Sequence, residues 1–343
     1  MYVNIRLDKN FTTQYNKLQA EYGTHIARLN GFDDNQLSYT DFIDNFIDEK
    51  TVADASIDGN SNVRRKDMVT LLTEMPKPHR KLLAFNKIYF EYLKKYGFAA
   101  ANDWLMREWT GQLYIHDGDT STFKHYCFAY DLKDLAEKGL YFMSENFNPN
   151  PPKHLVTFID FVKEYINFAS NRSSGAVGLP NLVPYMFYFW HKDVQSDYLG
   201  VKSSGSEKAY AEQNIQRFIY AVNQPCVRDG QQSAFTNTSV FDRNYLEALF
   251  GGSEFPDGTF MIDYMEEIME FQKLYMEVMA KIREENMFTF PVSSISPESK
   301  WLTIFSPSKP IFVCSCIETS KPSLTWQTPR ETVPFLLIVF FKM

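Results

Sequence analysis

The chain has 343 residues, of which 44% are hydrophobic and 16% aromatic, enough apolar material for one large domain or two ordinary ones. Its formal net charge of -7 argues against direct nucleic-acid binding, which normally needs a basic face. The N-terminus has no apolar signal core, and the longest late apolar run, 333–341, is too short to cross a bilayer. These features predict a cytoplasmic protein without a membrane span.

The four cysteines show no spacing typical of a secreted disulfide scaffold, which favours a reducing compartment. From the N-terminus, the apolar spacing predicts helix over parts of 11–29 and 41–48. Residues 66–96 predict two amphipathic helices separated at a pair of prolines.

A short strand is predicted at Leu113–Ile115, followed by a turn at His116 and Asp117. A second apolar segment, 123–130, contains Cys127. By itself a cysteine among aromatic residues is typically an inert small hydrophobe.

A polar loop, Ser173-Ser174-Gly175, stands between an apolar helix predicted at 155–168 and the apolar run that follows it. Glycine lets backbone N–H groups approach a ligand closely, and such a turn ahead of an apolar segment often holds a phosphate. The alternative is a polar turn before an ordinary buried strand or helix.

A second polar stretch, GQQSAFTN, contains Gln232, Ser233, Thr236 and Asn237. Neutral hydrogen-bonding side chains of this kind orient a polar substrate without burying charge. The alternative is a turn before a strand. Helices at 212–222 and 260–283 and a strand at 288–292 complete the pattern.

The sequences SSGAVGLP and QSAFTN together resemble the barrel of the anaerobic, glycyl-radical ribonucleoside-triphosphate reductases. The resemblance implies an α/β fold with part of a ten-stranded α/β barrel. It places an N-terminal helical segment at 1–50 and the first part of the reductase barrel at 51–297. Residues 298–343 are expected to be a non-homologous, poorly ordered tail, and no ATP-cone is recognised ahead of the barrel.

This family reduces ribonucleoside triphosphates to 2'-deoxyribonucleoside triphosphates by radical chemistry. The resemblance implies that Cys127 and His116 are catalytic. The residues implied to bind substrate lie in the two polar stretches: Ser173, Ser174, Gly175, Gln232, Ser233, Thr236 and Asn237.

The family also uses a glycyl radical, formate and a structural zinc held by four cysteines. The last glycine here is Gly258, and Cys314 and Cys316 do not form a C-x-x-C pair, so we expect no metal site. We expect this chain to be an incomplete fragment that does not reduce nucleotides alone. The implied partners are ribonucleoside triphosphates, dNTP or ATP effectors, a radical-SAM activating protein and, when complete, a second copy of the chain.

Two alternatives stay open. The chain could be an inactive or trans-complementing half-barrel, for which a neighbouring gene encoding the second half would be the evidence. It could instead be a formate-lyase-like glycyl-radical acyltransferase, although no adjacent Cys-Cys pair is present.

Overall fold

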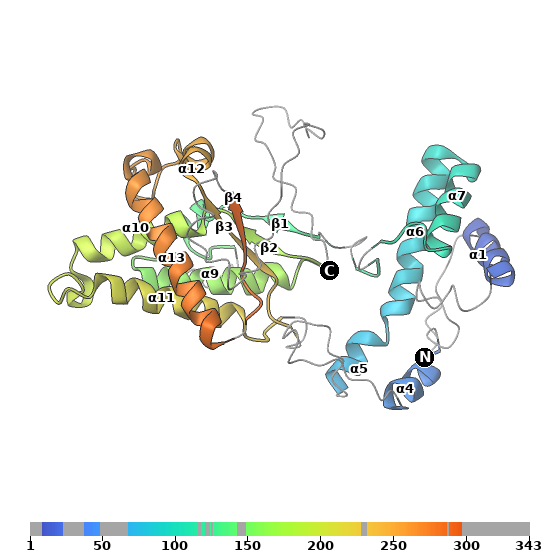
Figure 1. The fold of residues 1–343 in the computed structure, drawn as a ribbon. Helices are drawn as coiled ribbons and strands as arrows, with labels where there is room; N and C mark the ends of the chain where they lie inside the picture. The colour runs from blue at the N-terminus through green and yellow to red at the C-terminus, as the bar shows by residue number, and fades with distance from the viewer. Residues whose placement is uncertain are drawn as a thin grey trace.

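The computed structural model describes residues 9–22, 38–48, 68–115, 118–120, 124, 126–142, 149–227, 232–286 and 288–296. These residues form two groups of elements that stand apart in Figure 1, and each group has its own hydrophobic core. One core belongs to the helices that precede residue 110, called here the helical unit. The other belongs to residues 126–296, called here the sheet unit.

The helical unit contains the helices α1 (Lys9–Tyr22), α4 (Tyr39–Asp48), α5 (Met68–Glu74), α6 (Lys77–Tyr96) and α7 (Phe98–Trp109). Aromatic side chains from α1, α6 and α7 make its core. Helices on both sides of residue 50 therefore share one core.

The predicted break between two helices at the prolines is confirmed. Pro76 lies between α5 and α6, and Pro78 lies in the first turn of α6, where a missing N–H removes no helical hydrogen bond. The predicted strand at Leu113–Ile115 is wrong, because this segment is irregular. The N–H of Leu113 donates to the carbonyl oxygen of Arg107 on α7 at 3.0 Å, so the segment folds back onto the helix end.

The sheet unit is built on β1 (Phe128–Ala129), β2 (Val177–Leu179), β3 (Thr236–Phe241) and β4 (Val292–Ser296). All four strands are parallel and stand side by side in sequence order. The predicted α/β class is thereby confirmed, with strands in the order that a partial barrel requires.

Each pair of neighbouring strands is joined through helices. These are α8 (Lys133–Lys138), α9 (Leu155–Ser170), α10 (Leu182–Gln195), α11 (Glu207–Val222), α12 (Arg243–Phe250) and α13 (Met265–Glu285), with short 3-10 helices at Tyr198–Gly200 and Met261–Tyr264. Right-handed connections between sequential strands put all connecting helices on one face of a sheet. Consistent with one layer, α9 and α13 each pack against both α10 and α11.

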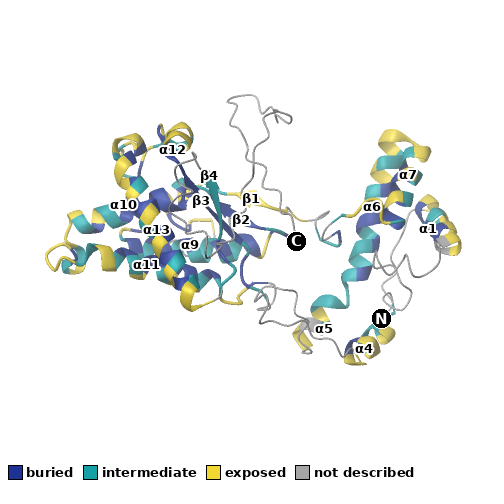
Figure 2. Cartoon of the chain, viewed as in Figure 1, coloured by how far each residue is buried: buried dark blue, intermediate teal, exposed yellow. Residues whose placement is uncertain are grey.

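The buried residues of the sheet unit concentrate on β2, on β3 and on the inner sides of these helices, whereas β1 is exposed and β4 is half-buried (Figure 2). Among the described helices, none combines the length and the apolar character needed to cross a membrane.

Candidate functional site

Cys127 lies immediately before β1, at the N-terminal end of the parallel strands. Its Sγ accepts a hydrogen bond from the N–H of Ala176 at 3.2 Å. The N–H of Gly175 donates to the carbonyl oxygen of Tyr126 at 2.8 Å, and that of Phe128 donates to Ala176 at 3.1 Å. The Ser-Ser-Gly loop and the cysteine segment are therefore bonded directly to each other.

Side chains of a strand point alternately to the two faces of the sheet. The ring of Phe128 lies beside that of Tyr130, which meets Tyr165 of α9 with centroids 5.3 Å apart. Phe128 and Tyr130 thus point toward the helix layer. The alternation directs Cys127 to the opposite face, on which none of the described connecting helices lies and which we call the helix-free face.

The same alternation separates two neighbours on β3. Thr238 Oγ1 lies 3.2 Å from the hydroxyl of Tyr275 on α13, so Thr238 and Thr236 point toward the helix layer. Thr236 Oγ1 is buried and has no hydrogen-bond partner among the described residues. Asn237 points to the helix-free face, and its Nδ2 donates to Ser294 Oγ on β4 at 3.0 Å.

Cys127 and Asn237 therefore lie on the same face of the sheet, with the small residues Ala129 and Gly178 between them. Ala129, Gly178 and Asn237 are in register across β1, β2 and β3, and Cys127 precedes Ala129 by two residues. Asn237 and Ala129 are separated by two spacings between strands, and Ala129 and Cys127 by two residues along one strand. Cys127 and Asn237 therefore lie roughly 12 Å apart. A small polar molecule lying on the Ala129–Gly178 floor can bridge that distance.

Asn223, at the end of α11, is a polar contact that the sequence reasoning missed. Its carbonyl oxygen accepts a hydrogen bond from Ser233 Oγ at 2.7 Å. Its Oδ1 accepts from the N–H groups of Thr289 at 3.3 Å and Phe290 at 3.0 Å, and its Nδ2 donates to the Phe290 carbonyl. Asn223 therefore joins the loops that lead into β3 and β4. Its only sequence signal is its place at a helix end before a proline.

The remaining predicted site residues differ in burial and in whether the structure describes them. Ser173 and Ser174 are buried, and Ser173 Oγ donates to the carbonyl oxygen of Gly175 at 3.4 Å. Gln232 is half-buried at the start of the loop before β3. His116 lies outside the described residues.

In the part of the chain that the structure describes, no three potential metal-ligating side chains gather. Cys226 is exposed, and its Sγ donates a hydrogen bond to Asn167 Oδ1 at 3.0 Å. Partial burial of the thiol raises its pKa. Cys314 and Cys316 lie outside the described residues, as does the predicted tail.

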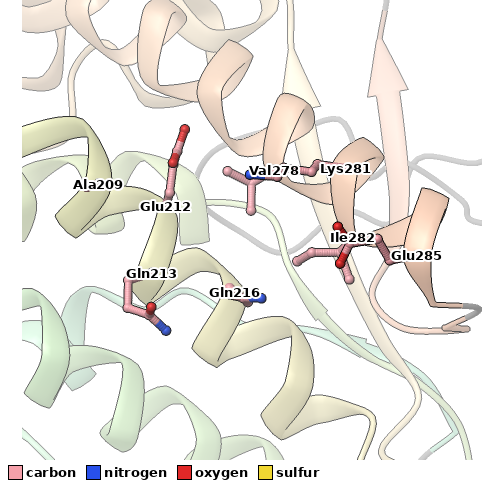
Figure 3. A pocket seen from close by; sticks show the side chains of 8 residues that line it. All are labelled: Ala209, Glu212, Gln213, Gln216, Val278, Lys281, Ile282 and Glu285. Atoms are coloured by element: carbon pink, nitrogen blue, oxygen red, sulfur yellow. The ribbon is translucent and has the colours of Figure 1, made fainter.

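A pocket of about 240 Å³ lies between α11 and α13 (Figure 3). Its lining is mostly long polar side chains around a small apolar floor: Ala209, Glu212, Gln213, Gln216, Val278, Lys281, Ile282 and Glu285. The volume is below that of most small-molecule sites, and none of the sequence-predicted site residues lines it.

Sequential parallel strands, with the described connecting helices on one face and Cys127 and Asn237 on the other, define an α/β protein whose strand order is that of part of a barrel. The chain belongs to the anaerobic ribonucleoside-triphosphate reductase family, whose model matches residues 79–321. The resemblance seen in the sequence is thereby confirmed.

Solved structures agree with this assignment. The anaerobic ribonucleotide reductase from Thermotoga maritima in complex with dATP and CTP is 34% identical, with a TM-score of 0.74, covering 86% of this chain and 46% of that chain. The same enzyme with citrate in the active site is 34% identical, with a TM-score of 0.72, covering 86% and 50%. This chain thus spans about half the length of these neighbours. No curated relative matches it at a significant level.

Proposed function

We propose that this chain supplies the first part of the catalytic barrel of an anaerobic ribonucleoside-triphosphate reductase. The reaction replaces the 2'-hydroxyl of the ribose with hydrogen through radical chemistry. The observation that carries the proposal is the placement of the Cys127 thiol and the Asn237 amide on one helix-free face, roughly 12 Å apart. The complex of the Thermotoga maritima enzyme with dATP and CTP supports nucleotides as substrate and effector.

In this proposal Cys127 is the thiol that faces the ribose, and Asn237 with Ser294 orients the substrate. His116 is the second catalytic residue. The other proposed substrate-binding residues are Ser173, Ser174, Gly175, Gln232, Ser233 and Thr236. Their contacts differ, since the Ser233 hydroxyl bonds to Asn223 and Thr236 points toward the helices. The proposed domain division keeps residues 51–297 as the reductase part, and the family match extends beyond this boundary to residue 321.

The same proposal includes five further features of the complete enzyme. These are dependence on formate, a glycyl radical, activation by a radical-SAM protein, a homodimer and a cytoplasmic location. A zinc site does not fit the described residues, because Cys127 and Cys226 belong to no group of metal ligands. No step of the reaction is assigned to zinc.

The test is a chimera in which residues 1–296 are joined to the remaining half of the Thermotoga maritima enzyme. It is activated anaerobically and incubated with CTP, dATP and formate. We expect dCTP to form, Cys127→Ala to abolish turnover while the glycyl radical signal persists, and Cys226→Ala to retain activity within a few-fold. Turnover by the Cys127→Ala chimera would contradict the assigned role, and turnover without formate would contradict only the formate-dependent type.

A further inference from the structure

The backbone amides of Ser173 and Gly175 in the Ser-Ser-Gly loop are engaged inside the protein. The N–H of Ser173 donates to a carbonyl of α9 at 3.0 Å, and that of Gly175 donates to Tyr126 at 2.8 Å. The next N–H, of Ala176, donates to Cys127 Sγ at 3.2 Å. A phosphate cradle needs amides that point at the ligand, whereas two successive amides here point at the cysteine segment.

Gly175 also supplies the space that the sulfur occupies. A Cβ at this position would lie 2.5 Å from Cys127 Sγ and 2.8 Å from the carbonyl oxygen of Tyr126. The second contact is with backbone, which cannot move without displacing β1. Gly178, three residues along, differs, since its Cβ would lie no closer than 3.3 Å to any atom, the nearest being the Phe128 carbonyl oxygen. Gly175 does not have a left-handed backbone, so its requirement is one of space.

We propose that Gly175 and Ala176 are positioning residues for the Cys127 thiol. Gly175 leaves room for the sulfur at the start of β1, and the Ala176 amide holds it there and stabilises its thiolate. The use of this thiol in nucleotide reduction rests on the proposed function. The positioning of the thiol by Gly175 and Ala176 does not depend on that function.

Cys226 provides an internal reference in the same chain. Its Sγ donates a hydrogen bond to Asn167 Oδ1, which favours the protonated thiol, and burial raises its pKa. At Cys127 the sulfur accepts from a backbone N–H, which favours the thiolate. Because the thiolate is the nucleophile, the two cysteines should react with alkylating agents in different pH ranges.

The experiment follows alkylation of the full chain by iodoacetamide between pH 6 and 10, with the modified peptides resolved by mass spectrometry. In the unaltered chain, Cys127 is expected to react with a lower pH midpoint than Cys226. Gly175→Ala should move the Cys127 midpoint up toward that of an ordinary cysteine, about 8.5, and slow its reaction at pH 7 by about tenfold. Gly178→Ala is the matched control and should change the Cys127 rate by less than about twofold, with the Cys226 rate constant in both variants.

A second variant, Ala176→Pro, removes the donor N–H without placing a group at Gly175, and it should raise the midpoint in the same way. An unchanged Cys127 profile in both variants would overturn the proposal. Equal changes at Cys127 and Cys226 would also overturn it, because the loop would then support only the general fold. No nucleotide or radical takes part, so failure of the reductase chimera would leave this result standing.

Discussion

The sheet unit and the helical unit each bury a carboxylate completely, but in different surroundings. In the sheet unit, Asp193 on α10 is held by three groups. Its oxygens lie 2.7 Å from His154 Nδ1, 2.8 Å from the N–H of Leu155 and 2.8 Å from the hydroxyl of Tyr210. These contacts join α9, α10 and α11 and replace the water that the carboxylate loses on folding.

In the helical unit, burial dominates at Glu108 on α7. It raises the pKa of this carboxyl to about 7, against the opposing charge of Lys81 on α6. Burial also lowers the pKa of Lys81. Donors aimed at its oxygens compensate the burial of Asp193, whereas at Glu108 burial raises the pKa despite the positive charge of Lys81 nearby.

The largest effect is expected from Asp193→Ala, which leaves the Leu155 amide and the Tyr210 hydroxyl buried without their acceptor. We expect the free energy of unfolding of the sheet unit to fall by about 3–5 kcal/mol. Urea unfolding followed by circular dichroism measures the loss, and hydrogen exchange should place it in α9–α11. Asp160→Ala is the control, because its ion pair with Arg217 is exposed and should contribute less than about 1 kcal/mol.

Glu108→Gln tests the raised pKa of the buried carboxyl in the helical unit. From pH 4.5 to about 7 the folded carboxyl keeps a proton that the unfolded chain has lost, so stability falls as pH rises through this window. The loss is on the order of 3 kcal/mol and is complete above pH 7. The variant should remove this component, seen as a smaller difference in urea midpoint between pH 5 and pH 8. An identical pH dependence in both proteins would show that the pKa of Glu108 is not raised.

Asn223→Ala tests whether neutral hydrogen bonds hold together the loops that lead into β3 and β4. It removes the side-chain bonds to Thr289 and Phe290, so we expect a loss of about 2 kcal/mol. Hydrogen exchange should rise in 232–241 and 288–296 but not in α6 and α7. Asn223→Asp keeps an acceptor for these N–H groups but sets its second oxygen against the Phe290 carbonyl oxygen, so we expect it to recover at most part of the loss. Uniformly raised exchange across both units would contradict a local role.

The smallest effect is expected from Arg80→Ala. Arg80 Nη2 on α6 lies 2.9 Å from Asp119 Oδ2 in a partly exposed pair, so its removal should cost less than about 1 kcal/mol. Because Asp119 lies on the chain that leads from the helical unit toward Cys127, hydrogen exchange around 118–120 should increase. A loss above about 2 kcal/mol would show that this contact contributes more than an exposed pair.

Much of the local structure followed from the sequence. Apolar periodicity predicted α6, α9, α11 and most of α13, since each buries one face against a core. The motifs SSGAVGLP and QSAFTN predicted the family through their resemblance to its barrel, and the family model confirms that prediction. The strand at Leu113–Ile115 was mistaken because local composition does not show that the segment bonds back to α7.

The sequence alone identified Cys127, the Ser-Ser-Gly loop and Asn237 as candidate polar groups and resembled a family that the family model confirms. Which of these groups meet depends on the tertiary structure. Register between parallel strands put Cys127 against Gly175 and Ala176, and Asn237 beside Ser294, whereas the alternation of side chains turned Thr236 the other way. Asn223 gained its role because the end of α11 came to lie beside a loop that follows 66 and 67 residues later in the chain, at Thr289 and Phe290. Such pairings depend on long-range packing, which no local pattern of residues encodes.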